Sequence, residues 1–202
     1  MILAAKTTII DTFIAALRAG DQEAFKMLVA DYRQKVFNTA ISMVQDHGMA
    51  EDISQEVFVT VYKSILSFNG KSAISTWIYR ITVNKCLDHL RAKKRRKHGI
   101  IGQLFYGDTG EPVHDNPDFI HPGIQLERKE KSVYLFQAVE SLPENQKTVF
   151  ILAHIEELPQ KEIAEIMSMS LKAVESLLQR AKGNLRKKLT HIYEKESKTG
   201  NV

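Results

Sequence analysis

The apolar residues of this chain recur mainly at spacings of three and four, which is the pattern of amphipathic α-helices. The clearest case is the stretch of residues 75–97, whose side chains we place about 100° apart around a helix. One sector then carries Tyr79, Val83, Cys86, Leu87 and Leu90. The opposite sector carries Trp77, Arg80, Asn84, Asp88, Arg91 and Arg95. We therefore predict one long helix with a core face and a polar face, capped at its start by Ser75 or Thr76.

The polar face of this helix holds the only tryptophan of the chain. Tryptophan is highly buried on average, so a core helix normally turns it inward. Aromatic, guanidinium and amide groups together can stack an unpaired base, hold a phosphate and read a base edge. Basic amphipathic helices also occur as simple solvated faces. Taken alone, this face leaves both interpretations open.

Two helices are predicted near the start of the chain. Residues 8–17 carry apolar positions at helical spacing, and Asp21 is placed to cap the helix that follows. That second helix has apolar positions between Phe25 and Val44, until His47 and Gly48 interrupt the pattern. We interpret both helices as packing elements.

A third helix is predicted over residues 50–66. Its apolar side is formed by Ile53, Val57, Val61 and Ile65. Its first turns are crowded with Glu51, Asp52, Gln55 and Glu56. Carboxylates at this position suit the helix dipole, and they also suit a surface that recognises a basic partner helix. The pattern leaves the two explanations open.

The composition changes abruptly after Lys97. Residues 98–125 contain no lysine or arginine, while Asp108, Glu111, Asp115 and Asp118 stand among glycines and prolines. This indicates a flexible acidic linker over residues 98–126, which joins two modules. We predict an all-α protein with small helical domains at 1–97 and 127–192, followed by a disordered tail at 193–202.

The second module contains a candidate helix-turn-helix in residues 158–189. A helix over residues 144–154 precedes it, and a break at residues 168–170 separates its two helices. In the second of these helices the predicted buried stripe is Leu171, Val174, Leu178, Ala181 and Leu185. The predicted exposed residues are Lys172, Glu175, Ser176, Gln179, Arg180, Lys182 and Arg186. A helix with such an exposed face can enter a DNA major groove.

Charge and composition narrow the function. The net charge of +4 and pI near 9.0 permit an anionic partner, and the single cysteine excludes an intramolecular disulfide, which agrees with a reducing, cytoplasmic setting. No apolar run reaches the roughly 20 residues that span a bilayer, so we expect no direct membrane insertion. The seven histidines have no metal-ligand spacing, and no phosphate-binding glycine loop is present. We expect neither a cofactor nor a metal, and no enzyme.

Several motifs in order resemble the extracytoplasmic-function group of the sigma-70 family of RNA polymerase sigma factors. The first module resembles region 2 of the family through ALRAGDQEAFKMLVADY, AEDISQEVFVTVY and STWIYRITVNKCLDHLR. The second resembles region 4 through SLPENQKTVFILAHIEELPQKEIAEIM and the helix-turn-helix that follows. The resemblance covers most of the chain and is weakest in the linker. Ser168 departs from the family pattern, because it stands where the turn usually has glycine.

The resemblance implies a promoter-reading subunit that is not an enzyme. In the family the acidic helix of region 2 docks on the beta-prime coiled-coil of core RNA polymerase, which here implies Asp52, Gln55 and Glu56. The resemblance also implies which residues melt and hold the −10 element of the promoter: Phe68, Trp77, Arg80, Asn84, Arg91 and Arg95. The residues that it implies for recognition of the −35 element are Ser170, Lys172, Glu175, Ser176, Gln179 and Arg180. Region 4 would also meet the beta flap, and an anti-sigma factor is implied as a partner that holds the protein at the membrane.

Three other interpretations compete with this one. A dimeric helix-turn-helix regulator of duplex DNA accounts for residues 158–189 but leaves Trp77 and Asp52 unexplained. An enzyme lacks a recognisable catalytic cluster. A protein adaptor would show no salt-sensitive binding of nucleic acid.

Overall fold

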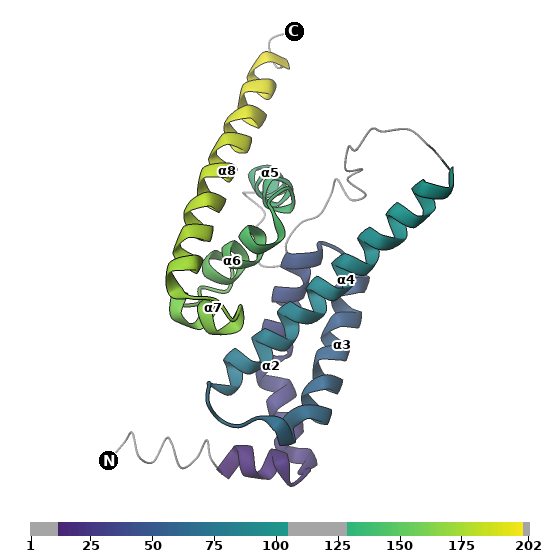
Figure 1. The fold of residues 1–202 in the computed structure, drawn as a ribbon, viewed down its shortest axis with the longest axis vertical. Coiled ribbons are helices and arrows are strands. Elements are labelled where there is room, and N and C mark those ends of the chain that lie inside the picture. The colour runs from purple at the N-terminus through teal and green to yellow at the C-terminus, as the bar shows by residue number, and fades with distance from the viewer. Residues whose placement is uncertain (1–11, 105–128, 200–202) are drawn as a thin grey trace.

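The computed structural model describes residues 12–104 and 129–199, and only the backbone for residues 97–104, 129–133 and 191–199. After a helical segment at residues 12–18, the elements of the first domain are α2 (Gln22–Val44), α3 (His47–Ser64), the short 3-10 helix η1 (Ile65–Ser67) and α4 (Ile74–Leu104). Those of the second domain are α5 (Lys129–Glu140), α6 (Glu144–His154), α7 (Gln160–Ile166) and α8 (Leu171–Thr199). The described part of the chain contains no strand, so the predicted all-α class is confirmed (Figure 1).

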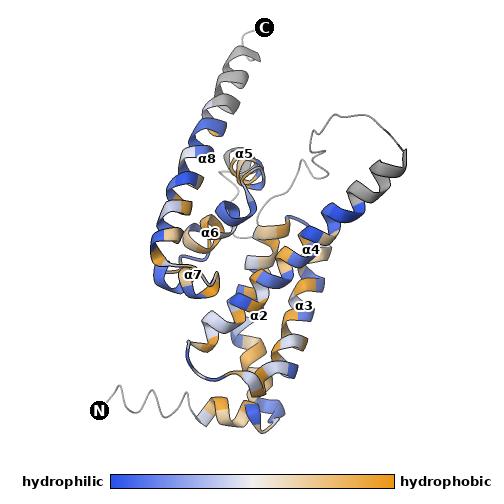
Figure 2. Cartoon of the chain, in the orientation of Figure 1, coloured by the Kyte–Doolittle hydropathy of each residue, from blue (hydrophilic) through white to orange (hydrophobic). Residues whose placement is uncertain are grey.

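The first domain is a bundle in which α2, α3 and α4 pack pairwise against one another. Its fully buried side chains include Leu28, Ile41, Met43, Ile53, Val57, Val61, Ile78 and Val83. Figure 2 shows that apolar residues alternate with polar ones along these helices, as the spacing of three and four requires. All four residues of the predicted apolar side of α3 are buried, which confirms that prediction.

Side-chain caps set the limits of α2 and α3. The Asp21 carboxylate accepts from the backbone N–H of Glu23 at 2.8 Å and of Ala24 at 3.2 Å, as predicted. The break between α2 and α3 lies earlier than predicted, because Gln45 adopts a left-handed conformation with φ of 51° and ends α2. Asp46 then caps α3, so His47 and Gly48 belong to the helix.

The long helix α4 has the core face that the sequence predicts. Tyr79, Val83, Cys86 and Leu87 are buried, and burial raises the pKa of the Cys86 thiol to about 12. The ends of the helix differ from the prediction, because α4 begins at Ile74 and continues to Leu104. Its last residues therefore occupy the start of the predicted linker, while residues 105–128 lie outside the described residues.

The second domain packs α5, α6 and α7 against α8. The turn of the helix-turn-helix contains no glycine, and Ser168 takes the left-handed conformation with φ of 51°. The backbone N–H of Met169 donates to the carbonyl of Ala164, which closes the end of α7. Leu171, the first residue of α8, was predicted to be buried, but its side chain is exposed.

The far end of α8 also differs from the sequence prediction. The helix extends to Thr199, so its backbone is helical at residues 193–199, where we predicted a disordered tail. The last three residues of the chain lie outside the described residues.

The α3 helix allows a paired test of this core. Ile53 has no exposed surface, whereas Val59 of the same helix is 52% exposed. We expect Ile53→Ala to lower the free energy of unfolding by about 2–5 kcal/mol, because it leaves a cavity in the bundle. Val59→Ala is expected to change that free energy by less than about 0.5 kcal/mol. Urea denaturation of both variants measures the difference, and equal losses would contradict the packing described here.

Candidate functional site

One face of α3 combines exposed acidic and exposed apolar side chains. Asp52 and Gln55 are exposed near its N-terminal end. Val59 and Tyr62 follow in α3 and Leu66 follows in the adjoining η1, and they are 52%, 56% and 73% exposed. We call these five residues the α3 stripe. Apolar side chains that gather on a surface mark a binding site more often than isolated ones do.

The acidic end of the α3 stripe was predicted from the sequence, but its apolar half was not. Val59 and Leu66 recur at a spacing of seven from Asp52 and Val59 respectively. This spacing places Val59 on the same side of α3 as Asp52, and Leu66 continues the stripe in η1. The periodicity of the exposed face was the signal that locates them.

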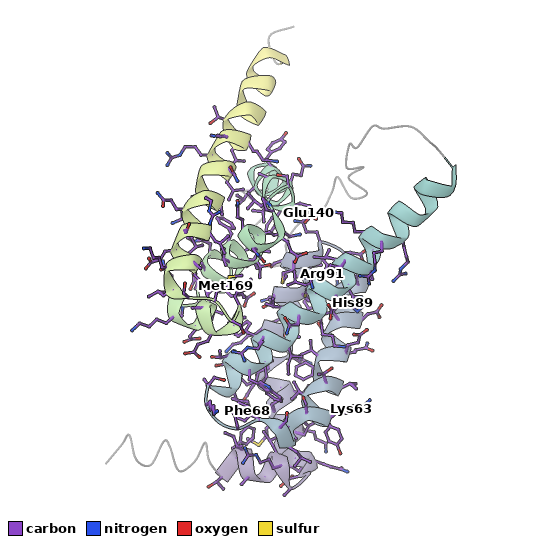
Figure 3. The ribbon with its side chains drawn as sticks, in the orientation of Figure 1. Lys63, Phe68, His89, Arg91, Glu140 and Met169 are labelled. Carbon is purple, nitrogen blue, oxygen red and sulfur yellow. The ribbon has the colours of Figure 1, made fainter. Side chains whose placement is uncertain are left out.

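Glu56 has a different position from its predicted partners. Its carboxylate accepts from Lys85 Nζ at 3.1 Å and lies 3.0 Å from His89 Nε2, so it joins α3 to α4. The hydrogen bond from Lys85 is the largest of the effects that lower the pKa of Glu56. His89 lies on the side of α4 that faces α3 (Figure 3). Glu56 therefore contributes to the packing of the two helices as well as to the acidic surface.

The predicted −10 aromatic residues are packed together rather than exposed. Phe68 is only 3% exposed, and its ring centroid lies 5.1 Å from that of Trp77, with the planes inclined by 41°. Trp77 is partly buried and packs against the core. The guanidinium of Arg18 donates to the Phe68 carbonyl, which holds this segment over the first turn of α4. The helical angle of Trp77 alone could not show this, because the covering segment precedes the helix.

The polar face of α4 is divided between solvent and the second domain. Asn84, Asp88 and Arg95 are exposed. Arg91 Nη2 lies 2.6 Å from Glu144 Oε1, on the first turn of α6. The guanidinium of Arg80 donates to the carbonyl of Glu165 in α7. Tertiary packing thus occupies two of the predicted DNA-binding arginines.

The exposed face of α8 keeps the long polar side chains that the sequence predicts. Lys172, Glu175, Gln179 and Arg180 are all exposed there. Arg180 folds back along the helix, with Nη2 at 3.0 Å from the Ser176 hydroxyl oxygen.

Ser170 has a local role at the start of the same helix. Its hydroxyl oxygen accepts from the backbone N–H of Ala173 at 3.2 Å, so the side chain caps α8. Ser170 and Ser176 therefore shape the start of α8 and the position of Arg180, respectively.

These features define a two-domain helical protein with a helix-turn-helix in its second domain. Residues 28–96 match the family described as Sigma-70 region 2, and residues 132–185 match Sigma-70, region 4. The chain is 31% identical to the RNA polymerase sigma-H factor of Pseudomonas aeruginosa over 87% of this chain and 91% of that protein. It is also 31% identical to the ECF RNA polymerase sigma-E factor of Escherichia coli strain K12, over 84% of this chain and 88% of that protein.

The fold is shared with solved structures. CnrH in complex with the cytosolic domain of CnrY aligns with a TM-score of 0.64 and 22% identity, over 90% of this chain and 97% of that one. The sigma factor RpoE in complex with the anti-sigma factor NepR from Bartonella quintana aligns with a TM-score of 0.62 and 20% identity, over 82% and 96%. The chain belongs to the extracytoplasmic-function group of the sigma-70 family, a family that binds core RNA polymerase and promoter DNA.

Within residues 12–104 and 129–199, no helix combines the length and apolar character that crossing a membrane requires. The same residues contain no cluster of three or more histidine, cysteine, aspartate or glutamate side chains placed to hold a metal ion.

The contact of Glu56 with α4 gives a test in pH. Because the pKa of Glu56 is lowered in the folded protein, its ionised form stabilises the fold above its ordinary value of 4.5, and this contribution is lost as the pH falls below it. We expect Glu56→Gln to lower the free energy of unfolding at pH 7 by less than about 1 kcal/mol, since the pair is partly exposed. Urea denaturation at pH 7 and below pH 4.5 measures the loss, which should shrink in acid. The control Asp52→Asn removes an exposed carboxylate of the same helix, and an equal loss in this control would contradict the role of Glu56.

Proposed function

We propose that this protein binds core RNA polymerase and directs it to promoters that carry −35 and −10 elements, where it helps to open the DNA. One observation carries the proposal: a helix-turn-helix with an exposed polar face and a basic helix with an aromatic pair at its start lie in separate domains of one chain. A protein that recognises only duplex DNA needs the helix-turn-helix but not the basic helix with its aromatic pair. Two readers on two domains suit two DNA elements separated along a promoter.

Docking on polymerase is assigned to the α3 stripe together with Glu56. Asp52, Gln55 and Glu56 offer acceptors to a basic helix, and the beta-prime coiled-coil is the partner that family membership suggests. Val59 and Leu66 would add apolar contact area next to these acceptors. An interface commonly combines an apolar centre with a polar edge, and the α3 stripe has this composition.

Holding of the −10 element is assigned to the polar face of α4. Asn84 and Arg95 are exposed and suit a base edge and a phosphate, respectively. Trp77 would stack on an unpaired base, and the ring of Phe68 would support the Trp77 ring. Arg80 and Arg91 would bind the DNA strand once their contacts with the second domain are released. Stacking returns about 1–3 kcal/mol per base, and unstacking costs a few kcal/mol per step. Opening therefore also depends on phosphate contacts and on the polymerase.

Reading of the −35 element is assigned to α8. Lys172 and Arg180 suit guanine or phosphate, Gln179 suits adenine, and Glu175 suits the amino group of cytosine. Ser170 and Ser176 would support these contacts through the cap of α8 and the hold on Arg180. The remaining surface of this domain would meet the beta flap.

Regulation by an anti-sigma factor is part of the proposal. Of the two solved structures described above, one contains the sigma factor RpoE bound to the anti-sigma factor NepR, and the other contains CnrH bound to the cytosolic domain of CnrY. We propose that this chain works in the cytoplasm, where an anti-sigma factor anchored in the membrane would hold it inactive.

Run-off transcription tests the whole proposal. Core RNA polymerase is given a library of random promoters with and without this protein, and the start sites are sequenced. We expect protein-dependent start sites that share two upstream motifs. A two-fold symmetric binding site on duplex DNA without any dependent start would instead support a dimeric regulator and contradict the proposal.

Substitution of two exposed amide side chains tests the proposed DNA contacts without disturbing the core. On a promoter recovered from the library, we expect Asn84→Ala and Gln179→Ala each to lower initiation by an amount equivalent to about 1–3 kcal/mol, because each loses a base contact. Asn84→Ala should relax selection at the −10 motif only, and Gln179→Ala at the −35 motif only. The control is Gln34→Ala, an exposed amide on α2. Unchanged motifs in both test variants would contradict the assignment of the two helices.

The apolar half of the α3 stripe can be tested by binding. We expect Val59→Ala to weaken the affinity for core polymerase about 3- to 10-fold, because a buried contact there loses apolar area. Fluorescence anisotropy of labelled protein titrated with core enzyme measures this affinity. The control Met27→Ala truncates an apolar side chain of α2 that is 60% exposed and lies outside the stripe. Equal affinity in Val59→Ala and the wild-type protein would remove Val59 from the interface.

A further inference from the structure

The helical segment at residues 12–18 makes a contact with a distant part of the chain. The guanidinium of Arg18 donates to the backbone carbonyl of Phe68, 50 residues further on. Phe68 ends η1, and its own N–H donates to the carbonyl of Ile65 at 3.1 Å. Among the described residues, no backbone N–H donates to the Phe68 carbonyl. A carbonyl beside a buried side chain needs a donor, and Arg18 supplies it.

Two features fix the position of Arg18. The preceding residue, Leu17, is only 4% exposed and belongs to the core of the first domain. The segment then ends at Gly20, whose φ of 78° lies in the left-handed region that glycine adopts readily. The backbone N–H of Gly20 donates to the Leu17 carbonyl at 3.1 Å, which closes this end. Arg18 is therefore held between a buried anchor and a tight turn.

The Phe68 carbonyl lies between two parts of the predicted −10 surface. Before it, the Phe68 side chain is buried against the ring of Trp77, with 5.1 Å between the centroids. After it comes an exposed turn, in which Asn69 Oδ1 accepts from the backbone N–H of Lys71 at 3.1 Å and Gly70 has a φ of 72°. Because the peptide group is planar, a donor that fixes this carbonyl also fixes the direction in which the turn leaves the aromatic pair.

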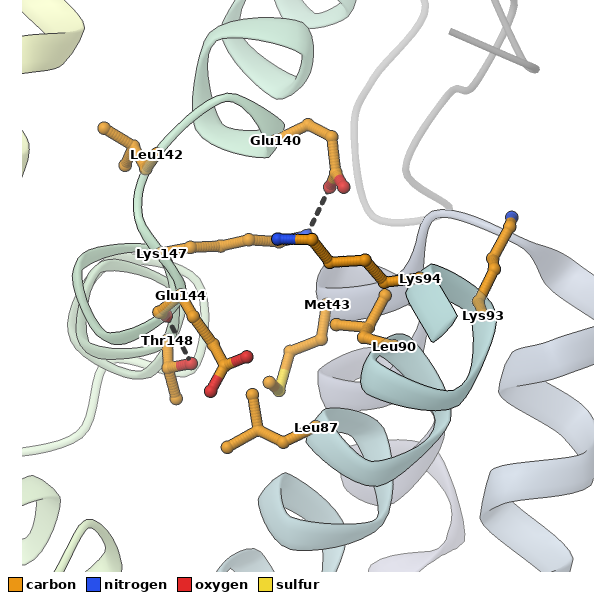
Figure 4. Close-up of a pocket in the computed structure, with 10 residues that line it drawn as sticks. All are labelled: Met43, Leu87, Leu90, Lys93, Lys94, Glu140, Leu142, Glu144, Lys147 and Thr148. Atoms are coloured by element: carbon orange, nitrogen blue, oxygen red, sulfur yellow. Dashed lines mark hydrogen bonds and ion pairs between the residues drawn. The ribbon is translucent and has the colours of Figure 1, made fainter. Parts of the chain in front are cut away.

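The second domain contacts α4 further along the helix. Figure 4 shows Leu87 and Leu90 facing α6 across a pocket of about 370 Å³. Phe68 lies at the end of the first domain that residues 12–18 also occupy (Figure 3). The contact between Arg18 and Phe68 therefore belongs to the first domain alone.

We propose that Arg18 is a positioning residue for the −10-binding surface, which holds the aromatic pair through the Phe68 carbonyl. The inference rests on the proposed function of α4. Without this donor the peptide group after Phe68 can rotate, and the Phe68 ring then supports the Trp77 ring for less of the time. A base stacks more tightly on a ring whose orientation is fixed before binding. In this role Arg18 acts on the −10 element through Phe68 and does not itself contact the DNA.

The fluorescence of Trp77 tests the positioning in the free protein, because this is the only tryptophan of the chain. Arg18→Met keeps a long unbranched side chain and removes the donor. We expect the acrylamide quenching constant of Trp77 to rise about 1.5- to 3-fold in this variant, since local opening exposes the ring. Arg18→Lys keeps a charged donor and should bring the constant back toward the wild-type value.

The loss of charge needs a matched control. Arg33 is exposed on α2, and among the described residues its side chain makes no hydrogen bond or ion pair. Arg33→Met removes the same charge and should leave the quenching of Trp77 unchanged. Far-UV circular dichroism and urea denaturation check that each variant is folded. If Arg18→Met is not folded, Arg18→Ala removes the donor without adding an apolar end and takes its place.

Run-off transcription from the random promoter library measures the functional effect. We expect the start sites that depend on Arg18→Met to share a relaxed −10 motif and an unchanged −35 motif, because the helix-turn-helix lies in the other domain. On a promoter recovered with the wild-type protein, initiation should fall about 3- to 10-fold, which corresponds to losing part of the stacking of one base. Arg18→Lys should recover both the motif and the rate.

Failure of this inference and failure of the proposed function give different results. Unchanged Trp77 quenching in Arg18→Met overturns the positioning role, and a lower rate of initiation would then indicate a direct phosphate contact. Raised quenching with an unchanged −10 motif overturns the link between the aromatic pair and the −10 element. In both cases the proposed function stands if the wild-type protein gives dependent start sites. A wild-type protein without dependent start sites overturns the proposed function and the role of Arg18 in it.

Discussion

Helix α4 has to serve two surfaces at once, and the rest of the structure depends on this constraint. Val83 and Cys86 are buried, and α4 packs against both α2 and α3, which fixes the rotation of the helix about its axis. That rotation in turn fixes where Asn84 and Arg95 point. A basic helix held by so much buried apolar surface keeps its polar side chains in place without any DNA present.

The contacts made by α4 also connect the surfaces proposed to be functional in the two domains. Glu56 pairs with Lys85 and His89, so the acidic face of α3 and the core of the bundle share the same helix neighbour. On its other side α4 meets α7 and the first turn of α6 through Arg80 and Arg91. The surfaces proposed for polymerase docking, −10 binding and −35 reading are therefore linked through one element. This arrangement gives a physical route by which a partner on one surface affects another.

Sequence periodicity located most of the fold, because burial in an all-α protein repeats every three or four residues. It found the buried side of α3, the core face of α4 and the exact limits of α6. It failed where the backbone conformation of one residue ends a helix, as Gln45 ends α2. It also failed where a helix continues through residues of mixed composition, as α4 does beyond Lys97 and α8 does beyond residue 192. It also predicted Leu171 to be buried, whereas this first residue of α8 is exposed.

The sequence alone determined the helical class, the helix-turn-helix, the family resemblance and the residue types of the two helices that we propose to contact DNA, because these depend on local spacing and composition. Only the tertiary structure decided which of those residues are free. Phe68 is buried over Trp77, Glu56 is shared with α4, and Arg80 and Arg91 are bound by the second domain. These outcomes depend on segments that are distant in the chain, and a helical angle contains no information about what packs against it.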